Sequence, residues 1–292
     1  MMRVLIIGCG YVGLPLGAEL VRLGHEVFGL RRSAAAENDM RSAGIKPLCG
    51  DVTKPETLAK LPNNFDWVVN CVAAGGNVEN YRAVYLQGTQ NLLAWLAPNP
   101  PRKFIYTSST SVYAQNDGSS VNETSPVEPL AETSKILVET EKILLTAATE
   151  RRFPAAVFRV AGIYGPERGH WFKQFLKGEA TLAGDGSRFL NMIHRDDVVG
   201  CIIAALKNGS AGEIYNAVDD EPVSQKDFFS WLAQKTSKPL PPSEPKNHAV
   251  RKRGATNKRV QNRKLKSELN YQFKYPTFRE GYGEELVRLN RL

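Results

Sequence analysis

Short apolar runs alternate with longer segments of helical periodicity from residue 3 to about residue 165. Five runs are mostly apolar throughout, which is typical of strands covered on both faces: Arg3–Ile7, Glu26–Leu30, Trp67–Cys71, Lys103–Thr107 and Ala155–Val160. Helices are predicted between them over Val12–Arg22, Tyr81–Trp95 and Ser134–Ala148. This alternation predicts βαβ units, and therefore an α/β fold with a doubly wound parallel sheet of the Rossmann type.

Beyond residue 165 the pattern becomes less regular and richer in glycine and charge. It predicts three further helices, at Trp171–Leu176, Asp196–Leu206 and Gln225–Gln234. The segment Lys238–Pro245 contains four prolines and predicts an extended connection. A chain of 292 residues has room for one large domain or two modest ones, so this second part can form a smaller lobe.

The net charge of +8 comes from one segment. Residues 246–266 contain nine Lys and Arg side chains and no acid, which leaves 29 basic against 30 acidic residues elsewhere. Such a segment can bind nucleic acid, bind an anionic small molecule, or form a solvated surface. Nucleic acid is the least favoured of the three, because the segment lacks the interleaved aromatic residues of single-strand binders and any recognition motif.

The four cysteines, Cys9, Cys49, Cys71 and Cys201, have no metal-ligand or CxxC spacing, so neither a metal site nor a disulfide framework is predicted. The apolar run Val4–Ile7 is too short for the core of a signal peptide, and no run approaches the roughly 18 apolar residues that cross a bilayer. The sequence therefore predicts a cytoplasmic protein without a membrane partner.

A glycine-rich turn follows the first predicted strand directly and opens the first helix. It reads Gly8-Cys9-Gly10-Tyr11-Val12-Gly13, a G-x-G-x-x-G pattern. In this context the pattern predicts a dinucleotide site, where Gly8 allows the tight turn, Gly10 admits the pyrophosphate and Gly13 lets the helix pack closely. The backbone at Tyr11 and Val12 would then present N–H groups to the phosphates at the positive end of the helix. A tight turn without ligand is the alternative.

The second predicted strand runs into Arg31-Arg32-Ser33, where an NAD site usually has Asp or Glu for the ribose 2′-hydroxyl. Two guanidinium groups and a hydroxyl suit a 2′-phosphate instead, because arginine offers paired donors to phosphate oxygens. The sequence therefore predicts a preference for NADP(H) over NAD(H). A solvated arginine pair at the end of a strand is the alternative.

Further motifs follow along nearly the whole chain in the order shared by one superfamily. They are Gly50-Asp51-Val52, Val72-Ala73-Ala74, Gly88-Thr89, residues 107–113 (TSSTSVY), residues 122–126 (NETSP), residues 158–166 (FRVAGIYGP), residues 193–197 (IHRDD) and residues 212–216 (GEIYN). With the glycine turn, they resemble the short-chain dehydrogenase/reductase superfamily, in its extended, epimerase/dehydratase-like branch and its atypical members.

The resemblance implies a seven-stranded parallel sheet and two lobes. Residues 1–165 would form the NAD(P)-binding domain, to which residues 191–216 return. Residues 166–190 and 217–292 would form a smaller substrate-binding lobe. The resemblance also implies cofactor contacts along the strand ends, from Asp51, Val52, Val72, Ala73, Ala74 and Lys135.

In this superfamily a Ser, a Tyr and a Lys catalyse hydride and proton transfer together. Ser109 and Lys135 match two of these positions, and the resemblance assigns Ser109 and Thr110 to the substrate as well. The position of the Tyr is Ala131, whose methyl group cannot transfer a proton. The helix position usually held by Asn is Tyr85, a second departure that favours the atypical members.

Four other side chains could in principle replace the missing phenol. They are Tyr113, Tyr164, His170 and His194. The two tyrosines fit as packing residues of their motifs, His170 as an exposed loop residue, and His194 as a structural hydrogen-bonding residue beside Asp196 and Asp197. None of the four is favoured as the acid.

Two functions remain open. One is an NAD(P)-dependent oxidoreductase or epimerase/dehydratase-like enzyme acting on a sugar-like or nucleotide-linked substrate, and the other is a non-catalytic NADP(H)-binding sensor, which Ala131 favours. For the enzyme, Arg251, Arg253 and Arg259 are candidate contacts to an anionic substrate, with a solvated basic face as the alternative. The resemblance also implies a homodimer through the helix Ser134–Ala148.

Overall fold

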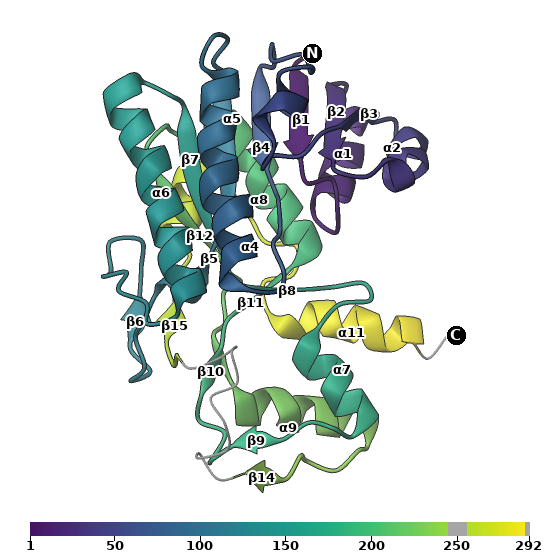
Figure 1. The fold of residues 1–292 in the computed structure, drawn as a ribbon. Coiled ribbons are helices and arrows are strands. Elements are labelled where there is room, and N and C mark those ends of the chain that lie inside the picture. The colour runs from purple at the N-terminus through teal and green to yellow at the C-terminus, as the bar shows by residue number, and fades with distance from the viewer. Residues whose placement is uncertain (245–255, 290–292) are drawn as a thin grey trace.

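Seven parallel strands form the central sheet in a computed structural model that describes residues 1–244 and 256–289 (Figure 1). In chain order they are β1 (Arg3–Ile7), β2 (Glu26–Arg31), β3 (Lys46–Cys49), β4 (Trp67–Asn70), β5 (Lys103–Ser109), β7 (Ala155–Val160) and β12 (Ile214–Ala217). Their order across the sheet is β12-β7-β5-β4-β1-β2-β3, with every pairing parallel. The predicted Rossmann-type α/β fold is therefore confirmed.

The direction in which the chain adds strands reverses between β1 and β4. From β1 the chain adds β2 and β3 on one side, and it then adds β4, β5, β7 and β12 on the other. At such a switch point the loops after the two central strands turn away from each other and leave room for a ligand at the carboxyl edge of the sheet. The glycine turn follows β1, and the Val72-Ala73-Ala74 stretch follows β4.

Helices cover both faces of the sheet. One face packs against α1 (Gly13–Arg22), α8 (Arg195–Asn208) and α10 (Arg263–Leu269). The other packs against α5 (Gly88–Leu96) and α6 (Glu132–Arg151), with α5 preceded by α4 (Val78–Tyr81) and the π-helix η2 (Arg82–Gln87). Side chains alternate between the two cores along β5, since Ile105 joins the first and Phe104 and Tyr106 the second.

A smaller lobe lies below the carboxyl edge of the sheet in Figure 1, and aromatic side chains form its core. Its helices are α7 (His170–Lys177), α9 (Gln225–Thr236) and α11 (Phe278–Leu289). Tyr282 stacks on Tyr164 and on Phe172, with ring centroids 4.3 and 4.7 Å apart. Tyr164 lies only a few residues after the end of β7 at Val160, so this stacking joins the smaller lobe to the sheet.

The remaining elements are short. They are η1 (Ala34–Ala36), α2 (Glu37–Ser42), α3 (Pro55–Leu58), η3 (Thr110–Val112), β6 (Ser120–Val121), β8 (Gly162–Tyr164), β9 (Leu182–Ala183), β10 (Phe189–Leu190), β11 (Met192–His194), β13 (Val223–Ser224), β14 (Ser243–Glu244) and β15 (Arg259–Val260). Four two-stranded ladders join β10 with β13, β11 with β8, β14 with β9, and β15 with β6. The last ladder brings the basic segment against the loop after β5.

A buried polar cluster holds α6 against the sheet. The carboxylate of Glu141 on α6 accepts hydrogen bonds from the guanidinium of Arg159 on β7 (2.8 Å) and from the Ser108 hydroxyl on β5 (2.5 Å). Arg159 also donates to the Tyr113 hydroxyl, which donates to Asn216 on β12. The Arg159 and Glu141 side chains are only 4% and 3% exposed, so either charge without the other would be buried and unpaired.

We predict that Glu141→Leu lowers the free energy of unfolding by about 3 to 5 kcal/mol, because it leaves the Arg159 guanidinium buried without a counter-charge. The matched control is Glu139→Leu on the same helix, which removes an exposed pair with Arg82 and should cost less than about 1 kcal/mol. Urea denaturation of both variants measures the difference. Equal losses in the two variants would contradict the structural role of the buried pair.

Candidate functional site

The glycine turn after β1 touches the loop after β4. Gly8 has φ +86°, and a Cβ there would lie 2.8 Å from backbone atoms of Cys71 and Val72. A Cβ at Gly13 would lie 2.5 Å from the Gly8 carbonyl oxygen. Both positions therefore require glycine for the packing of the protein itself.

Gly10 differs from its two neighbours in the motif. A Cβ there would meet no atom within 4 Å, so the side of the turn at Gly10 is open. The helix α1 that follows has no side-chain cap at Val12. The Leu14 N–H donates to the Gly10 carbonyl at 2.9 Å and Pro15 has no N–H, so the backbone N–H groups of Tyr11, Val12 and Gly13 are the donors left at its start. An open turn beside uncapped N–H donors fits a phosphate group at this position.

The predicted 2′-phosphate contacts lie beside the same turn. The Arg31 guanidinium, at the end of β2, donates to the Cys9 carbonyl oxygen at 3.2 Å, which places it against the glycine turn. The side chain of Arg32 is exposed. The Ser33 hydroxyl oxygen accepts from the Ala35 N–H at 3.2 Å. Arg31 is thus the best placed of the three residues for a group bound on the turn.

The other predicted cofactor residues line the carboxyl edge. Asp51 forms a local turn, since its Oδ1 accepts from the N–H and hydroxyl of Thr53. Val52 is buried against Gly88 of α5, where a Cβ would approach it to 2.9 Å. The structure thus leaves Asp51 half-buried at this edge and Val52 in the packing.

Tyr85, which departs from the usual Asn, supports the loop after β4. Its hydroxyl oxygen accepts from the Ala74 N–H at 3.1 Å. Tyr85 lies in the π-helix η2, a feature often found at functional sites. Ala73 is exposed, whereas Val72 is half-buried and its N–H is held by the side chain of Asn70 at 3.3 Å.

Ser109 and Lys135 lie on neighbouring segments. Ser109 ends β5, and its hydroxyl oxygen accepts from the Ser111 N–H at 3.1 Å; the Ser134 hydroxyl, next to Lys135 on α6, donates to the Ser111 hydroxyl at 3.1 Å. Lys135 is exposed and paired with Glu132 at 2.7 Å. The first turn of α6 is therefore fastened to the turn that carries Ser109.

Ala131 is the N-cap residue of α6, one turn before Lys135, and it is exposed. Its carbonyl oxygen accepts from the N–H groups of Ser134 and Lys135, which starts the helix. Thr110, by contrast, is only 9% exposed, so the turn η3 buries most of it.

The four side chains considered as replacements for the missing phenol have other contacts in the structure. Tyr113 and Tyr164 are fully buried, and their hydroxyls donate to Asn216 and to the Thr277 carbonyl. His194 caps α8 by accepting from the Asp196 N–H, and burial lowers the pKa of its imidazole to about 4. His170 is exposed at the start of α7, with its ring 5.0 Å from that of Trp171.

Sequence reasoning missed an arginine pair around Tyr11. The guanidinium carbons of Arg168 and Arg195 lie 4.8 and 5.4 Å from the centre of the Tyr11 ring. The Tyr11 hydroxyl donates to the Pro166 carbonyl at 3.1 Å, so the glycine turn contacts the segment that leads into the smaller lobe. The spacing of these residues along the chain carries no signal for this contact.

The basic segment is partly neutralised inside the protein. Lys264 pairs with Glu213 and Lys266 with Asp220. Arg259 is exposed, donates to the Gly118 carbonyl at 2.9 Å and lies over the Phe189 ring. Arg251 and Arg253, the other two predicted substrate contacts, lie outside the described residues. Arg259 thus packs on the loop after β5, where its remaining donors face solvent.

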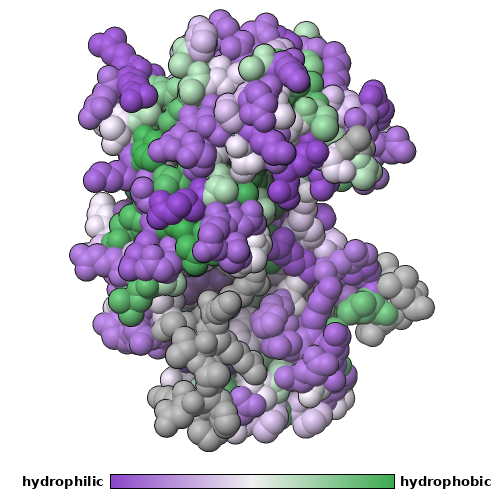
Figure 2. All heavy atoms as spheres, viewed as in Figure 1, coloured by the Kyte–Doolittle hydropathy of each residue, from purple (hydrophilic) through white to green (hydrophobic). Residues whose placement is uncertain are grey.

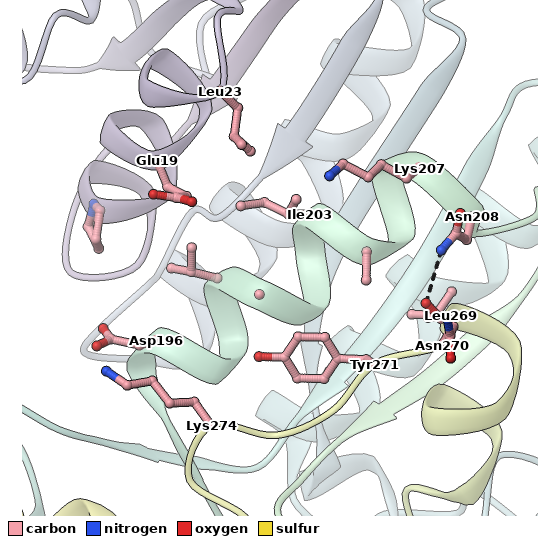
Figure 3. A pocket seen from close by; sticks show the side chains of 14 residues that line it. Glu19, Leu23, Asp196, Ile203, Lys207, Asn208, Leu269, Asn270, Tyr271 and Lys274 are labelled. Carbon is pink, nitrogen blue, oxygen red and sulfur yellow. Dashed lines mark hydrogen bonds between the residues drawn. The ribbon is translucent and has the colours of Figure 1, made fainter.

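A groove of about 760 Å³ lies away from all of these residues (Figure 3). Its walls come from the bodies of α1 and α8 and from the segment after α10, and it is lined among others by Glu19, Leu23, Ile203, Lys207 and Tyr271. The groove therefore lies over the helices on one face of the sheet, not at its carboxyl edge. None of the predicted site residues lines it.

The described residues contain neither a membrane-spanning helix nor a metal-binding cluster. Among residues 1–244 and 256–289, no helix combines the length and the apolar character needed to cross a membrane. In the same part of the chain, His, Cys, Asp and Glu side chains do not gather in a group that could hold a metal ion. All four cysteines are free thiols.

Comparison with known proteins identifies the family. A model of the NAD dependent epimerase/dehydratase family matches residues 4–217, which run from the second residue of β1 to the end of β12 and include all the motifs described above. The chain belongs to this family. The resemblance drawn from the motifs is therefore confirmed, and the family of NAD-dependent enzymes favours the enzyme interpretation.

Similar proteins match between two thirds and nearly all of the chain. Protein YeeZ of Escherichia coli K12 is 28% identical over 285 residues, covering 94% of this chain and 97% of YeeZ. An N-acetyl-glucosaminyl-diphospho-undecaprenol 4-epimerase of E. coli O157:H7 is 30% identical over 205 residues, covering 66% of this chain and 61% of that protein. A UDP-glucuronic acid 4-epimerase of Bacillus cereus shares the fold, with a TM-score of 0.83 over 99% of both chains at 22% identity.

We predict that Gly10→Ala leaves the melting temperature unchanged but weakens dinucleotide binding at least about tenfold, because the methyl group takes space that the phosphates need. Gly13→Ala is the contrasting variant: its methyl group meets the Gly8 carbonyl, so it should lower the melting temperature of the free protein. Thermal melts and fluorescence titration with NAD(H) and NADP(H) separate the two. Unchanged dinucleotide affinity in Gly10→Ala would exclude the turn as the phosphate site.

Proposed function

We propose that the protein is an NADP(H)-dependent oxidoreductase or epimerase/dehydratase-like enzyme that acts on a sugar-like or nucleotide-linked substrate. The observation that carries the proposal is the hydrogen bond between the Ser134 and Ser111 hydroxyls, which fastens the first turn of α6, with Lys135, to the turn of Ser109. The open turn at Gly10 follows β1 at the same carboxyl edge of the sheet.

The proposed cofactor preference follows from Arg31. Its guanidinium lies against the glycine turn and uses one of its five N–H donors on the Cys9 carbonyl. The remaining donors can meet a 2′-phosphate, and the second strand ends without the carboxylate that would bind a 2′-hydroxyl. The backbone from Gly10 to Gly13 would hold the pyrophosphate.

The proposed roles of Ser109 and Lys135 are to hold oxygens of the substrate and of the cofactor ribose. The Ser109 hydroxyl oxygen accepts from a backbone N–H, which leaves its own hydrogen free for a substrate oxygen. Lys135 is bound only by the exposed Glu132, a pair that is weak in water and easily exchanged for ribose hydroxyls. The bound nicotinamide would supply the hydride acceptor or donor.

The substrate class rests on the relatives and on charge. The 4-epimerase of E. coli O157:H7 bears the name of a diphosphate-linked amino sugar, and the B. cereus enzyme was solved with UDP-glucuronic acid and NAD. A basic segment beside the loop after β5 suits a substrate with a negative charge of this kind. A small anionic substrate is therefore favoured over nucleic acid.

A non-catalytic NADP(H)-binding sensor is the second candidate. Ala131 favours it, because no phenol stands at the N-terminus of α6 and both nearby buried tyrosines are hydrogen-bonded within the protein. Every other part of the proposed cofactor site is shared by the two candidates. Turnover alone distinguishes them.

We also propose a homodimer and a cytoplasmic location. Figure 2 shows hydrophobic side chains among the hydrophilic ones over α5 and α6, and α6 contains the helix Ser134–Ala148 expected at the dimer contact. Leu130, which precedes α6, is 91% exposed. Four free thiols suit a reducing compartment.

Titration should show NADP(H) binding at least about tenfold tighter than NAD(H). Arg31→Ala and Arg32→Ala should each weaken the binding of NADP(H) more than the binding of NAD(H), because only NADP(H) carries the 2′-phosphate. Arg22→Ala, which removes an exposed arginine of α1 held by Glu19, is the control and should change neither affinity. Tighter binding of NAD(H) by the unaltered protein would overturn the preference.

A panel of UDP- and dTDP-linked sugars, assayed with NADP(H) by chromatography and by nicotinamide absorbance, should reveal turnover. Lys135→Ala should lower it by about two orders of magnitude or more. Lys142→Ala, an exposed lysine two turns further along α6, should leave it unchanged. Bound NADP(H) without turnover would decide for the sensor, and turnover insensitive to Lys135→Ala would remove that residue from the mechanism.

A further inference from the structure

The groove of about 760 Å³ shown in Figure 3 is separate from the proposed active site. The helices α1 and α8 form its long walls, and the segment after α10 closes it. Its volume falls in the range of small-molecule sites, about 300 to 1,000 Å³. Leu23 follows the last residue of α1, which places it about 15 Å along the helix axis from the glycine turn. A ligand bound at Leu23 would therefore leave the cofactor site free.

Apolar side chains form much of the lining of the groove. Leu23 is 38% exposed, and Ile203 and Ala204 are half-buried, so all three present apolar surface to solvent. The Tyr271 hydroxyl donates to the buried Asp197 carboxylate at 2.7 Å, so Tyr271 contributes mainly its ring to the groove. Apolar surface gathered in a concave region is typical of places where another molecule binds.

Most polar groups on the same lining already have partners within the protein. The Glu19 carboxylate pairs with Arg22 at 2.6 Å, and the Asp196 carboxylate pairs with Arg195 at 2.8 Å. The Asn208 amide donates to the carbonyl at the end of α10 at 3.0 Å, a bond drawn as a dashed line in Figure 3. Both acids of the groove are therefore neutralised by arginines.

Lys207 is the lining cation that stays available. It is exposed in the last turn of α8, and among residues 1–244 and 256–289 no Asp or Glu lies within ion-pair distance of it. Figure 3 shows its ammonium group pointing across the groove in the direction of Leu23. Lys274, near the other end of the groove, lies over the Tyr275 ring at 4.7 Å. The groove therefore offers one unpaired positive charge beside its apolar surface.

We propose that the groove binds a small amphiphilic anion, with its charged head group on Lys207 and its apolar body along Leu23, Ile203 and Tyr271. An unpaired ammonium group beside an apolar surface is complementary to such a molecule, of which a fatty acid is the simplest example. The head group can be a carboxylate or a sulfonate, because both accept hydrogen bonds from lysine. The site is additional to the proposed function, since none of the residues assigned to the cofactor or the substrate lines the groove.

Titration of the full-length protein with decanoate and with the fluorescent probe anilinonaphthalene sulfonate tests the proposal. Measured in saturating NADP(H), which keeps both probes out of the dinucleotide site, the sulfonate should bind with a rise in fluorescence and decanoate should displace it. Decanol, which has the same chain without the charge, should bind at least about threefold more weakly, and high salt should remove the difference. Binding of neither anion to the unaltered protein would overturn the proposal.

Two variants separate the apolar and the charged part of the site. Leu23→Asp should weaken both anions at least about tenfold, because it places a carboxylate where the apolar body lies. Lys207→Met should weaken decanoate about threefold and leave decanol unchanged; as an exposed residue it tests the site even where Leu23→Asp fails to fold. The matched controls are Leu240→Asp, at a leucine that is 42% exposed, and Lys177→Met, in the last turn of α7. Equal losses in the controls would contradict a specific site.

Two further measurements distinguish this site from the cofactor site and from a protein contact. Lys207→Met should bind NADP(H) as the unaltered protein does, because Lys207 lies at the end of α8 and outside the glycine turn. If the unaltered protein binds no dinucleotide, the enzyme proposal fails, and the same variants still decide on the groove without cofactor. Sedimentation velocity covers the other occupant: a lower molecular mass of Leu23→Asp, with no binding of either anion, would assign the groove to a second copy of the chain and overturn the proposal.

Discussion

The buried pair of Glu141 and Arg159 is the constraint on which the site depends. One carboxylate on α6 binds a guanidinium on β7 and a hydroxyl on β5, and the guanidinium reaches Tyr113 in the following loop. Four segments that are distant in sequence are thus held by one desolvated charge pair. Because a buried charge tolerates little displacement from its partner, α6 cannot slide along the sheet without breaking it. Ser109 and Lys135 keep their relative positions for that reason.

At the other end of the site, steric contact around the glycine turn fixes the relative positions of the surrounding segments. Gly8 lets β1 turn directly against the backbone after β4, and Gly13 lets α1 start against the turn, whereas Gly10 meets no part of the protein. Gly8 and Gly13 are thus needed for the packing of the protein, whereas Gly10 leaves open space beside the turn. The Tyr11 ring then joins this turn to the segment before α7, between Arg168 and Arg195. The cofactor site and the smaller lobe are therefore mechanically linked through a single aromatic ring.

The sheet was predictable because its strands are apolar on both faces. β1 and β7 match the predicted bounds, whereas β3 was not predicted, since both of its end residues are exposed and its pattern is not apolar. Helix α11 was not predicted from the sequence, because its many charged residues obscure the apolar periodicity of its buried residues, which include Phe278 and Tyr282. Motif spacing located the glycine turn and Ser109. It could not locate the Tyr11 contacts, because these depend on how the smaller lobe packs against the sheet.

The cations that give the protein its net positive charge differ in whether they have an acidic partner. Lys264 and Lys266 have acidic partners, whereas no Asp or Glu of residues 1–244 and 256–289 pairs with Lys258 or Arg188. At the glycine turn, the open side at Gly10 lies beside backbone N–H groups at the start of α1, where no side chain caps the helix. In the part of the chain that the structure describes, the start of α1 and the surroundings of Lys258 and Arg188 are therefore both electropositive. Positive potential in these two regions suits the dinucleotide and the anionic substrate that the proposed function calls for, because each ligand would bring negative charge to one of them.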